Sequence, residues 1–259
     1  MEERMRPNTI KRLWAEDKPA LGAWLGSAST IVAEQMAHAG FDWLCVDGEH
    51  SPVDILTTVQ MMQVISSTDT IPIARVQWND PVQVKRVLDG GAYGVVIPWV
   101  NTAAEAEQAV AACRYPPRGI RGFGPYRGAM YAGSDYADHA DEEIACIIQI
   151  ETIGAVERID EILAVPGVDA TLIGPADLAM SLGVPVLPDN PHPDHVAACA
   201  EVLAGSRRNG VAPGIYCAHE EEAARRVTEG WKLLNIGTDG QYVAQGARRG
   251  LKLVRAASG

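Results

Sequence analysis

The hydrophobic residues of this chain gather into short continuous runs and do not alternate with polar ones. Eight runs of four to seven residues recur along the sequence. Continuous runs of this length are typical of strands in a parallel sheet, because helices cover both faces of such a sheet. The runs that we interpret as strands are Leu21–Leu25, Trp43–Val46, Ile71–Val76, Gly94–Ile97, Ile144–Ile150, Ala170–Ile173, Ala212–Tyr216 and Leu233–Ile236.

Segments with a helical pattern separate these runs. Most of them end at a glycine or a proline, as at Gly40, Gly210 and Gly230, where a helix commonly stops. Strand and helix therefore alternate to the end of the chain, which is the order of parallel strands joined by right-handed crossovers. The predicted helices cover residues 30–39, 53–66, 81–88, 102–114, 155–164, 193–209, 220–229 and 240–257.

Eight such units favour a closed (β/α)₈ barrel, an α/β fold that needs about 250 residues. The chain has 259, so we predict a single barrel domain over residues 1–259. An open doubly wound sheet is the main alternative, but no G-x-G-x-x-G follows the first strand. The segment 115–143 is long for a loop from a strand to a helix, and it is rich in Gly, Pro, Arg and Tyr. We interpret it as a lid or an inter-subunit segment.

Composition narrows the class of protein. Lysine and arginine number 22 against 33 aspartates and glutamates, a net charge of −11, with no basic cluster, so neither a nucleic-acid nor an anionic membrane partner is expected. No apolar stretch approaches the roughly 20 residues that span a bilayer. The first 14 residues are charged and lack a signal core, and the five cysteines form no C-x-x-C pair. We expect a cytoplasmic protein with reduced thiols that are buried or inert.

In a barrel the active site lies at the carboxyl ends of the strands, so the polar residues there are the candidates. Glu151 follows the fifth run and Asp177 follows the sixth. Two carboxylates with open positions suit Mg²⁺ or Mn²⁺. Alternatively, each could serve the helix that follows, Glu151 as a cap and Asp177 as a first-turn residue.

His50 and Arg75 are the other candidates at these ends. His50 comes three residues after Asp47, whose carboxylate could orient the imidazole and raise its basicity, although a surface histidine is the alternative. Arg75 ends an apolar run, so its guanidinium must meet an anion. That anion could be a substrate carboxylate or enolate, or the carboxylate of Asp47 or Glu49.

The few lysines of the chain bear on the type of catalytic mechanism. None of the five lysines stands at the carboxyl end of a predicted strand, so a Schiff-base aldolase would have no evident nucleophile. A glycine-rich phosphate loop is also missing from the sequence, and a phosphorylated substrate is therefore not indicated.

Six motifs taken together resemble the HpcH/HpaI aldolase family of metal-dependent class II pyruvate aldolases. They occur in order over nearly the whole chain, at residues 40–43, 47–52, 78–81, 114–119, 149–152 and 173–178. The resemblance implies a (β/α)₈ barrel of the phosphoenolpyruvate/pyruvate superfamily. It also implies a homo-oligomer, typically a hexamer built from dimers that exchange their last helix.

The resemblance also implies roles for individual residues. Glu151 and Asp177 match the ligands of Mg²⁺, Mn²⁺ or Co²⁺. Arg75 matches the arginine that binds the keto oxygen of pyruvate, and His50 with Asp47 matches the catalytic base.

Other positions match the surroundings of the substrate. These are Gln149, Gly174, Pro175 and Ala176 around pyruvate, and Asp89, which reaches a neighbouring subunit's site in relatives. Tyr216 departs from the family pattern, which often has an aliphatic residue there. A bulkier, hydroxylated residue near the pyruvate methyl bears on which 2-oxo acid is accepted.

The function implied is reversible retro-aldol cleavage of a 4-hydroxy-2-oxo acid to pyruvate and an aldehyde, through a metal-stabilised enolate. One alternative is an acyl-CoA lyase of the citryl- or malyl-CoA type, which would need a basic groove for the coenzyme. Another is a barrel that binds keto acids without catalysis.

Overall fold

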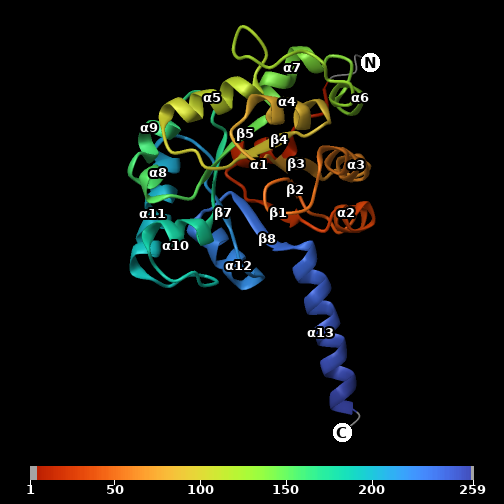
Figure 1. The fold of residues 1–259 in the computed structure, drawn as a ribbon, viewed down its shortest axis with the longest axis vertical. Coiled ribbons are helices and arrows are strands. Elements are labelled where there is room, and N and C mark those ends of the chain that lie inside the picture. The colour runs from red at the N-terminus through yellow and green to blue at the C-terminus, as the bar shows by residue number, and fades with distance from the viewer. Residues whose placement is uncertain (1–4, 258–259) are drawn as a thin grey trace.

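The computed structural model describes residues 5–257, and the first four and last two residues of the predicted domain lie outside this range. Eight parallel strands close into one barrel in the order β1 to β8, which confirms the predicted architecture (Figure 1). The observed strands are β1 (Ala20–Leu25), β2 (Trp43–Asp47), β3 (Ile71–Arg75), β4 (Gly94–Ile97), β5 (Ala145–Ile150), β6 (Ala170–Ile173), β7 (Gly214–Tyr216) and β8 (Leu233–Thr238).

Helices join the strands and surround the barrel (Figure 1). Helix α4 shows how the sequence sets their ends: Asp80 accepts a hydrogen bond from the N–H of Val82, and Pro81 occupies the first turn. The helices are α1 (Thr9–Ala15), α2 (Thr30–Ala37), α3 (Ile55–Ile65), α4 (Pro81–Asp89), α5 (Ala103–Cys113), α6 (Gly128–Ala132), α7 (Tyr136–Glu143), α8 (Ile153–Glu157), α9 (Ile159–Leu163), α10 (Pro175–Leu182), α11 (Pro193–Arg208), α12 (Glu220–Glu229) and α13 (Asp239–Ala257).

Some helix predictions were wrong in detail. The helix predicted at 53–66 begins at Ile55, because Asp54 caps it through the N–H of Thr57, and Ser51 and Pro52 precede it. The helix predicted at 155–164 is two short helices, α8 and α9, that meet at Arg158. The pattern also missed α1, α6, α7 and α10, all of eight residues or fewer, too short for a clear apolar period.

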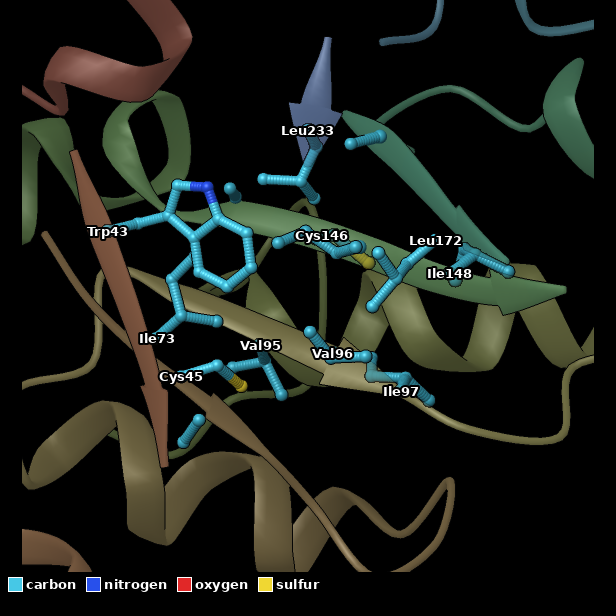
Figure 2. Close-up of a cluster of buried hydrophobic side chains, with 14 of the residues drawn as sticks. Trp43, Cys45, Ile73, Val95, Val96, Ile97, Cys146, Ile148, Leu172 and Leu233 are labelled. Carbon is cyan, nitrogen blue, oxygen red and sulfur yellow. The ribbon is translucent and has the colours of Figure 1, made fainter. Parts of the chain in front are cut away.

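The apolar side chains of the strands are buried on both faces of the sheet, inside the barrel and against the helices (Figure 2). Trp43 is among the largest of them, 1% exposed, and its indole N–H donates to the carbonyl of Ala20 at 3.1 Å. Gly22 on the neighbouring strand leaves the space that this ring fills, because a Cβ there would lie 2.0 Å from the indole. The five cysteines are buried and unpaired, as predicted.

The segment 115–143 connects α5 to β5, and therefore lies where strands begin, at the pole opposite their carboxyl ends. The interpretation of this segment as a loop from a strand to a helix, and as a lid over the chain's own site, was wrong. It packs instead against the end of α4, where Arg127 donates to the carbonyls of Gly90 and Met62. An inter-subunit role for it stays a prediction.

Helix α13 projects away from the barrel after β8 (Figure 1). Its buried residue, Asp239, accepts hydrogen bonds from the N–H groups of Gly26 and Ser27, which fixes the start of the helix to the β1–α2 loop. Within the described range, no helix combines the length and the apolar character that crossing a lipid bilayer requires.

Candidate active site

A cavity of about 410 Å³ opens at the carboxyl ends of the strands. It brings together most residues that the sequence singled out, although they lie far apart along the chain. Those that line it are Asp47, Arg75, Gln149, Gly174, Pro175, Ala176, Asp177 and Tyr216. Glu151 lies directly behind this lining, beside Gln149 and Gly174.

Asp47 and Arg75 form the best-defined contact of the site. They are register partners at the ends of β2 and β3, so their side chains leave the sheet side by side. Arg75 donates to both carboxylate oxygens of Asp47, from Nε at 2.9 Å and from Nη2 at 2.8 Å. Its Nη1 lies 2.9 Å from Glu49 Oε2, and its guanidinium lies over the Trp24 ring at 4.5 Å. Arg75 therefore meets the carboxylates that the sequence left as its alternative partners.

Burial and this ion pair act in opposite directions on the two groups. Burial disfavours the charged form of Asp47, but Arg75 outweighs it and holds the pKa of Asp47 below its usual value. Burial likewise disfavours the Arg75 cation, yet the carboxylates of Asp47 and Glu49 outweigh it and raise its pKa. Arg75 is thus a fixed positive charge at the mouth of the barrel.

Glu49 is another acidic residue at this mouth, and it has fewer hydrogen-bond partners than Asp47. Burial raises its pKa, and the negative charges of Asp47 and Asp177 add to the effect, while Arg75 and His50 oppose it. Its Oε2 atom is buried and accepts no hydrogen bond from the described residues, although Arg75 is near. The site therefore holds more negative charge than Arg75 alone balances.

His50 lies at the rim with its side chain 63% exposed. Asp47 accepts a hydrogen bond from the backbone N–H of His50 at 3.3 Å, and the imidazole Nε2 lies 3.8 Å from Glu49 Oε1. The prediction that the Asp47 carboxylate orients the imidazole thus needs a correction: Asp47 holds the His50 backbone, and its carboxylate is engaged by Arg75. The catalytic role of His50 stays a prediction.

Glu151 is 2% exposed, and both of its oxygens accept hydrogen bonds, Oε1 from the N–H of Trp99 at 2.7 Å and Oε2 from the side-chain amide of Gln149. Trp99 adopts a left-handed backbone with φ 60°, which is unfavourable for a residue with a side chain. Gly174 is required nearby, since a Cβ there would lie 2.9 Å from Glu151 Oε2. Glu151 is therefore tightly packed and hydrogen-bonded, with no room for a side chain at position 174.

Burial raises the pKa of Glu151, and the nearby charges of Glu49 and Asp177 add to it, although Gln149 and the Trp99 N–H lower it. Carboxylates that repel one another in a buried site are the donor set that a divalent cation stabilises. Asp177 is the first-turn acid of α10, and it faces the cavity as well. Within residues 5–257, however, three or more His, Cys, Asp or Glu side chains do not gather in a metal-binding cluster. Glu151 and Asp177 have the hard oxygen donors that divalent cations take, and their role as metal ligands stays a prediction.

The turn from β6 into α10 presents backbone to the cavity. The helix begins at Pro175, and the N–H groups of its first turn have no acceptor within the helix. His195, on α11 and 1% exposed, lies beneath this turn with Nε2 3.0 Å from the carbonyl oxygen of Pro175. The turn is thereby supported from below, and it is suited to bind an anion.

Two other predicted residues lie in different surroundings. Tyr216 ends β7 and lines the cavity, with its ring 6.3 Å from that of Trp24, and burial raises the pKa of its hydroxyl. Asp89 ends α4 at the opposite pole, where it pairs with Arg121 at 2.9 Å. Within one chain Asp89 is therefore remote from this cavity, and its role in a neighbouring subunit stays a prediction.

Sequence reasoning missed Trp24, Trp99 and His195 as parts of the site, and it considered Glu49 only as an ion-pair partner of Arg75. Glu49 stood in a quoted motif and could have been found from its position after β2. Trp99 contributes a backbone N–H, for which a sequence carries no signal. His195 looked like an ordinary helix residue, because only the packing of α11 under the α10 turn brings it to the cavity.

Comparison with known proteins shows similarity over nearly the whole chain. The profile of the HpcH/HpaI aldolase/citrate lyase family matches residues 20–246. Enzymes named 4-hydroxy-2-oxo-heptane-1,7-dioate aldolase are similar, at 41% identity in Salmonella dublin and 39% in Escherichia coli, each over 93% of this chain and 92% of the relative. The crystal structure of an HpcH/HpaI aldolase/citrate lyase family protein from Burkholderia cenocepacia J2315 superposes with a TM-score of 0.90 at 37% identity, covering 96% of this chain and 99% of that one.

Proposed function

Since the chain belongs to the HpcH/HpaI aldolase/citrate lyase family, we propose that it is an aldehyde-lyase that cleaves a 4-hydroxy-2-oxo acid reversibly to pyruvate and an aldehyde. The observation that carries this proposal is the composition of one cavity: a fixed cation, Arg75, beside carboxylates in excess of it and a helix N-terminus. The helix N-terminus and Arg75 match two demands of the reaction, which are to bind a carboxylate and to stabilise an enolate. The third demand, to move a proton, falls to a residue at the rim of the cavity.

The pyruvate half of the substrate carries a carboxylate and a 2-oxo group. The first-turn N–H groups of α10 would bind the carboxylate, because the helix dipole and free donors there favour an anion. Arg75 would hold the 2-oxo oxygen and stabilise the charge that develops on it when the carbon–carbon bond breaks. The buried pair with Asp47 supports this role, because it fixes the guanidinium before substrate arrives.

A divalent metal ion, Mg²⁺, Mn²⁺ or Co²⁺, is part of the proposal, with Glu151 and Asp177 as its protein ligands. When bound, such an ion supplies Lewis-acid stabilisation of the enolate charge, worth several kcal/mol. The raised pKa of Glu151, with the nearby charges of Glu49 and Asp177, supports a cation there. Gln149 would position Glu151 through its amide hydrogen bond.

His50 is proposed as the proton-transfer residue. It would take the proton from the 4-hydroxyl group during cleavage, and from the methyl group of pyruvate in the direction of synthesis. Its exposure at the rim supports exchange of that proton with water, and Asp47 positions it through the backbone.

The test is exchange of the pyruvate methyl protons for deuterium, followed by NMR, together with pyruvate release from 4-hydroxy-2-oxo acids. We expect both activities with Mg²⁺, Mn²⁺ or Co²⁺ and neither after chelation. Borohydride with pyruvate should not inactivate the enzyme. Inactivation by borohydride, with activity that survives chelation, would indicate a lysine mechanism and overturn the proposal.

A homo-oligomer in which neighbouring subunits cover α13 is the second part of the proposal. Val243, Leu251 and Leu253 are 65%, 55% and 73% exposed on this projecting helix (Figure 1). Their burial by another subunit would remove apolar surface from water. Light scattering of the full chain should give a dimer or hexamer, and truncation after Thr238 should lower the order of assembly; a monomeric full chain would contradict it.

A further inference from the structure

The cavity at the carboxyl ends has lining residues besides those assigned to pyruvate. They include Val186, Leu187 and Pro188, which follow α10, and Ala218, which follows β7. These apolar residues belong to the same cavity as Arg75. A molecule bound at Arg75 can therefore extend into this region without leaving the cavity.

The wall is fixed in place by polar contacts of the residues that flank it in the sequence. Arg225 of α12 donates to both oxygens of Asp189, at 2.8 and 2.5 Å. Asn190 is 4% exposed, and its amide donates to the carbonyl of Pro185 at 2.7 Å. The three apolar residues 186–188 lie between these anchors, so the wall is a built part of the site.

The charged groups around this region do not favour an anion. Apart from Arg75, no described arginine or lysine lines the cavity, whereas Asp177, Asp189 and Glu222 do. Arg75 is already matched by two carboxylates. The nearest arginines outside the lining are engaged, Arg225 by Asp189 and Arg226 by Glu222 and Glu229.

We propose that this region, between Tyr216 and residues 186–188, binds the hydrocarbon part of an uncharged aliphatic aldehyde and rejects an aldehyde that carries a carboxylate. The inference rests on the proposed function and adds the class of aldehyde. It sets this chain apart from the relatives named for heptane-1,7-dioate, a substrate with a carboxylate at each end. An apolar wall selects an alkyl chain by its burial, and an anion there would lose hydration without gaining a cation.

Butanal and succinic semialdehyde are a matched pair for the test, because both have four carbons and they differ in a terminal methyl or carboxylate. Aldol addition of each to pyruvate is measured with the Mg²⁺- or Mn²⁺-supplemented enzyme, and pyruvate methyl exchange is measured in the same samples. We expect kcat/KM for butanal to exceed that for succinic semialdehyde by at least about tenfold. Leu187→Lys should lower this ratio by about tenfold or more, because it places a cation in the wall. Leu56→Lys adds the same charge at an exposed residue outside the cavity, and it should leave the ratio unchanged.

The outcomes distinguish failure of this inference from failure of the proposed function. A wild-type preference for succinic semialdehyde, with pyruvate exchange intact, overturns the inference and leaves the proposed function standing. The same holds if Leu187→Lys and Leu56→Lys give equal ratios. Absence of pyruvate exchange in the wild-type enzyme overturns both.

Discussion

The two poles of the barrel both contain buried arginines, but the arginines have different surroundings. At the pole where strands begin, Arg114 donates to the carbonyls of Ile144 and Gly167 and to the carboxylate of Asp169. At the pole where strands end, Arg75 faces the carboxylates of Asp47 and Glu49. Both side chains are nearly inaccessible, at 6% and 10% exposure.

The two arginines differ in the net charge of the groups around them. The carbonyl and carboxylate partners of Arg114 suit a connection between α5, β5 and the loop before β6. Around Arg75 the acids exceed the cation, burial raises the pKa of Glu49 and Glu151, and an open cavity adjoins them. A buried arginine is therefore not by itself a sign of function, whereas a surplus of buried carboxylates beside a cavity is.

The largest effect is expected from Glu151→Gln at the carboxyl pole. The amide can still accept the hydrogen bond from Trp99, but it removes the charge that would hold the metal. Pyruvate exchange should fall at least about a thousandfold, because several kcal/mol of charge stabilisation are lost. Thermal unfolding should show a folded protein with a melting temperature no lower than that of the wild type without metal. Retention of exchange within tenfold would remove Glu151 from the mechanism.

Arginine-to-lysine substitutions at the two poles give the next test. The first is Arg75→Lys. Lysine keeps the positive charge and loses the planar fork that contacts both oxygens of Asp47. Exchange should fall by about a hundredfold, as when one donor to a developing oxyanion is removed. Urea unfolding should change by less than about 1.5 kcal/mol, since the ion pair persists in part.

Arg114→Lys should have the opposite profile. Lysine cannot reach both carbonyls and the Asp169 carboxylate, so buried acceptors lose their donors. The free energy of unfolding should fall by about 2–3 kcal/mol, while exchange per folded molecule stays at the wild-type rate. If Arg114→Lys slowed exchange as strongly as Arg75→Lys, the distinction between the poles would fail.

The smallest effect concerns pH. Because the folded pKa of Asp47 is lowered from 3.8, its ionised form stabilises the fold at pH values above 3.8, and this contribution is lost as pH falls through the folded pKa. Asp47→Asn should cost about 1–2 kcal/mol of unfolding free energy near pH 7. The difference from the wild type should shrink steadily below pH 3.8 in urea titrations. If the difference in unfolding free energy did not depend on pH, the pairing with Arg75 would not lower the pKa of Asp47.

The fold was largely predictable because its signal is periodic and local. All eight apolar runs are strands, with ends that differ by at most two residues, since burial on both faces demands continuous hydrophobicity. The segment 115–143 was misplaced for a related reason: its composition indicates a loop, but only its position between α5 and β5 determines at which pole it lies.

The sequence predicted the site residues that lie at the ends of the strands. Asp47, Arg75 and Asp177 were found because the ends of parallel strands converge. The hydrogen bond from the backbone of His50 to Asp47 could not be predicted, because a sequence does not tell which group a carboxylate contacts. The hexamer, the exchanged helix and the cytoplasmic location stay predictions.

Deuterium incorporation into the methyl group of pyruvate is the decisive measurement, because it reports metal-dependent enolate formation without any choice of aldehyde. With enzyme freed of metal by chelation and dialysis, we expect no incorporation above the uncatalysed rate, and full recovery on addition of Mg²⁺, Mn²⁺ or Co²⁺. The Glu151→Gln enzyme should not recover with the same ions. Incorporation by the metal-free wild-type enzyme at the full rate would show that enolate formation needs no metal at Glu151 and Asp177.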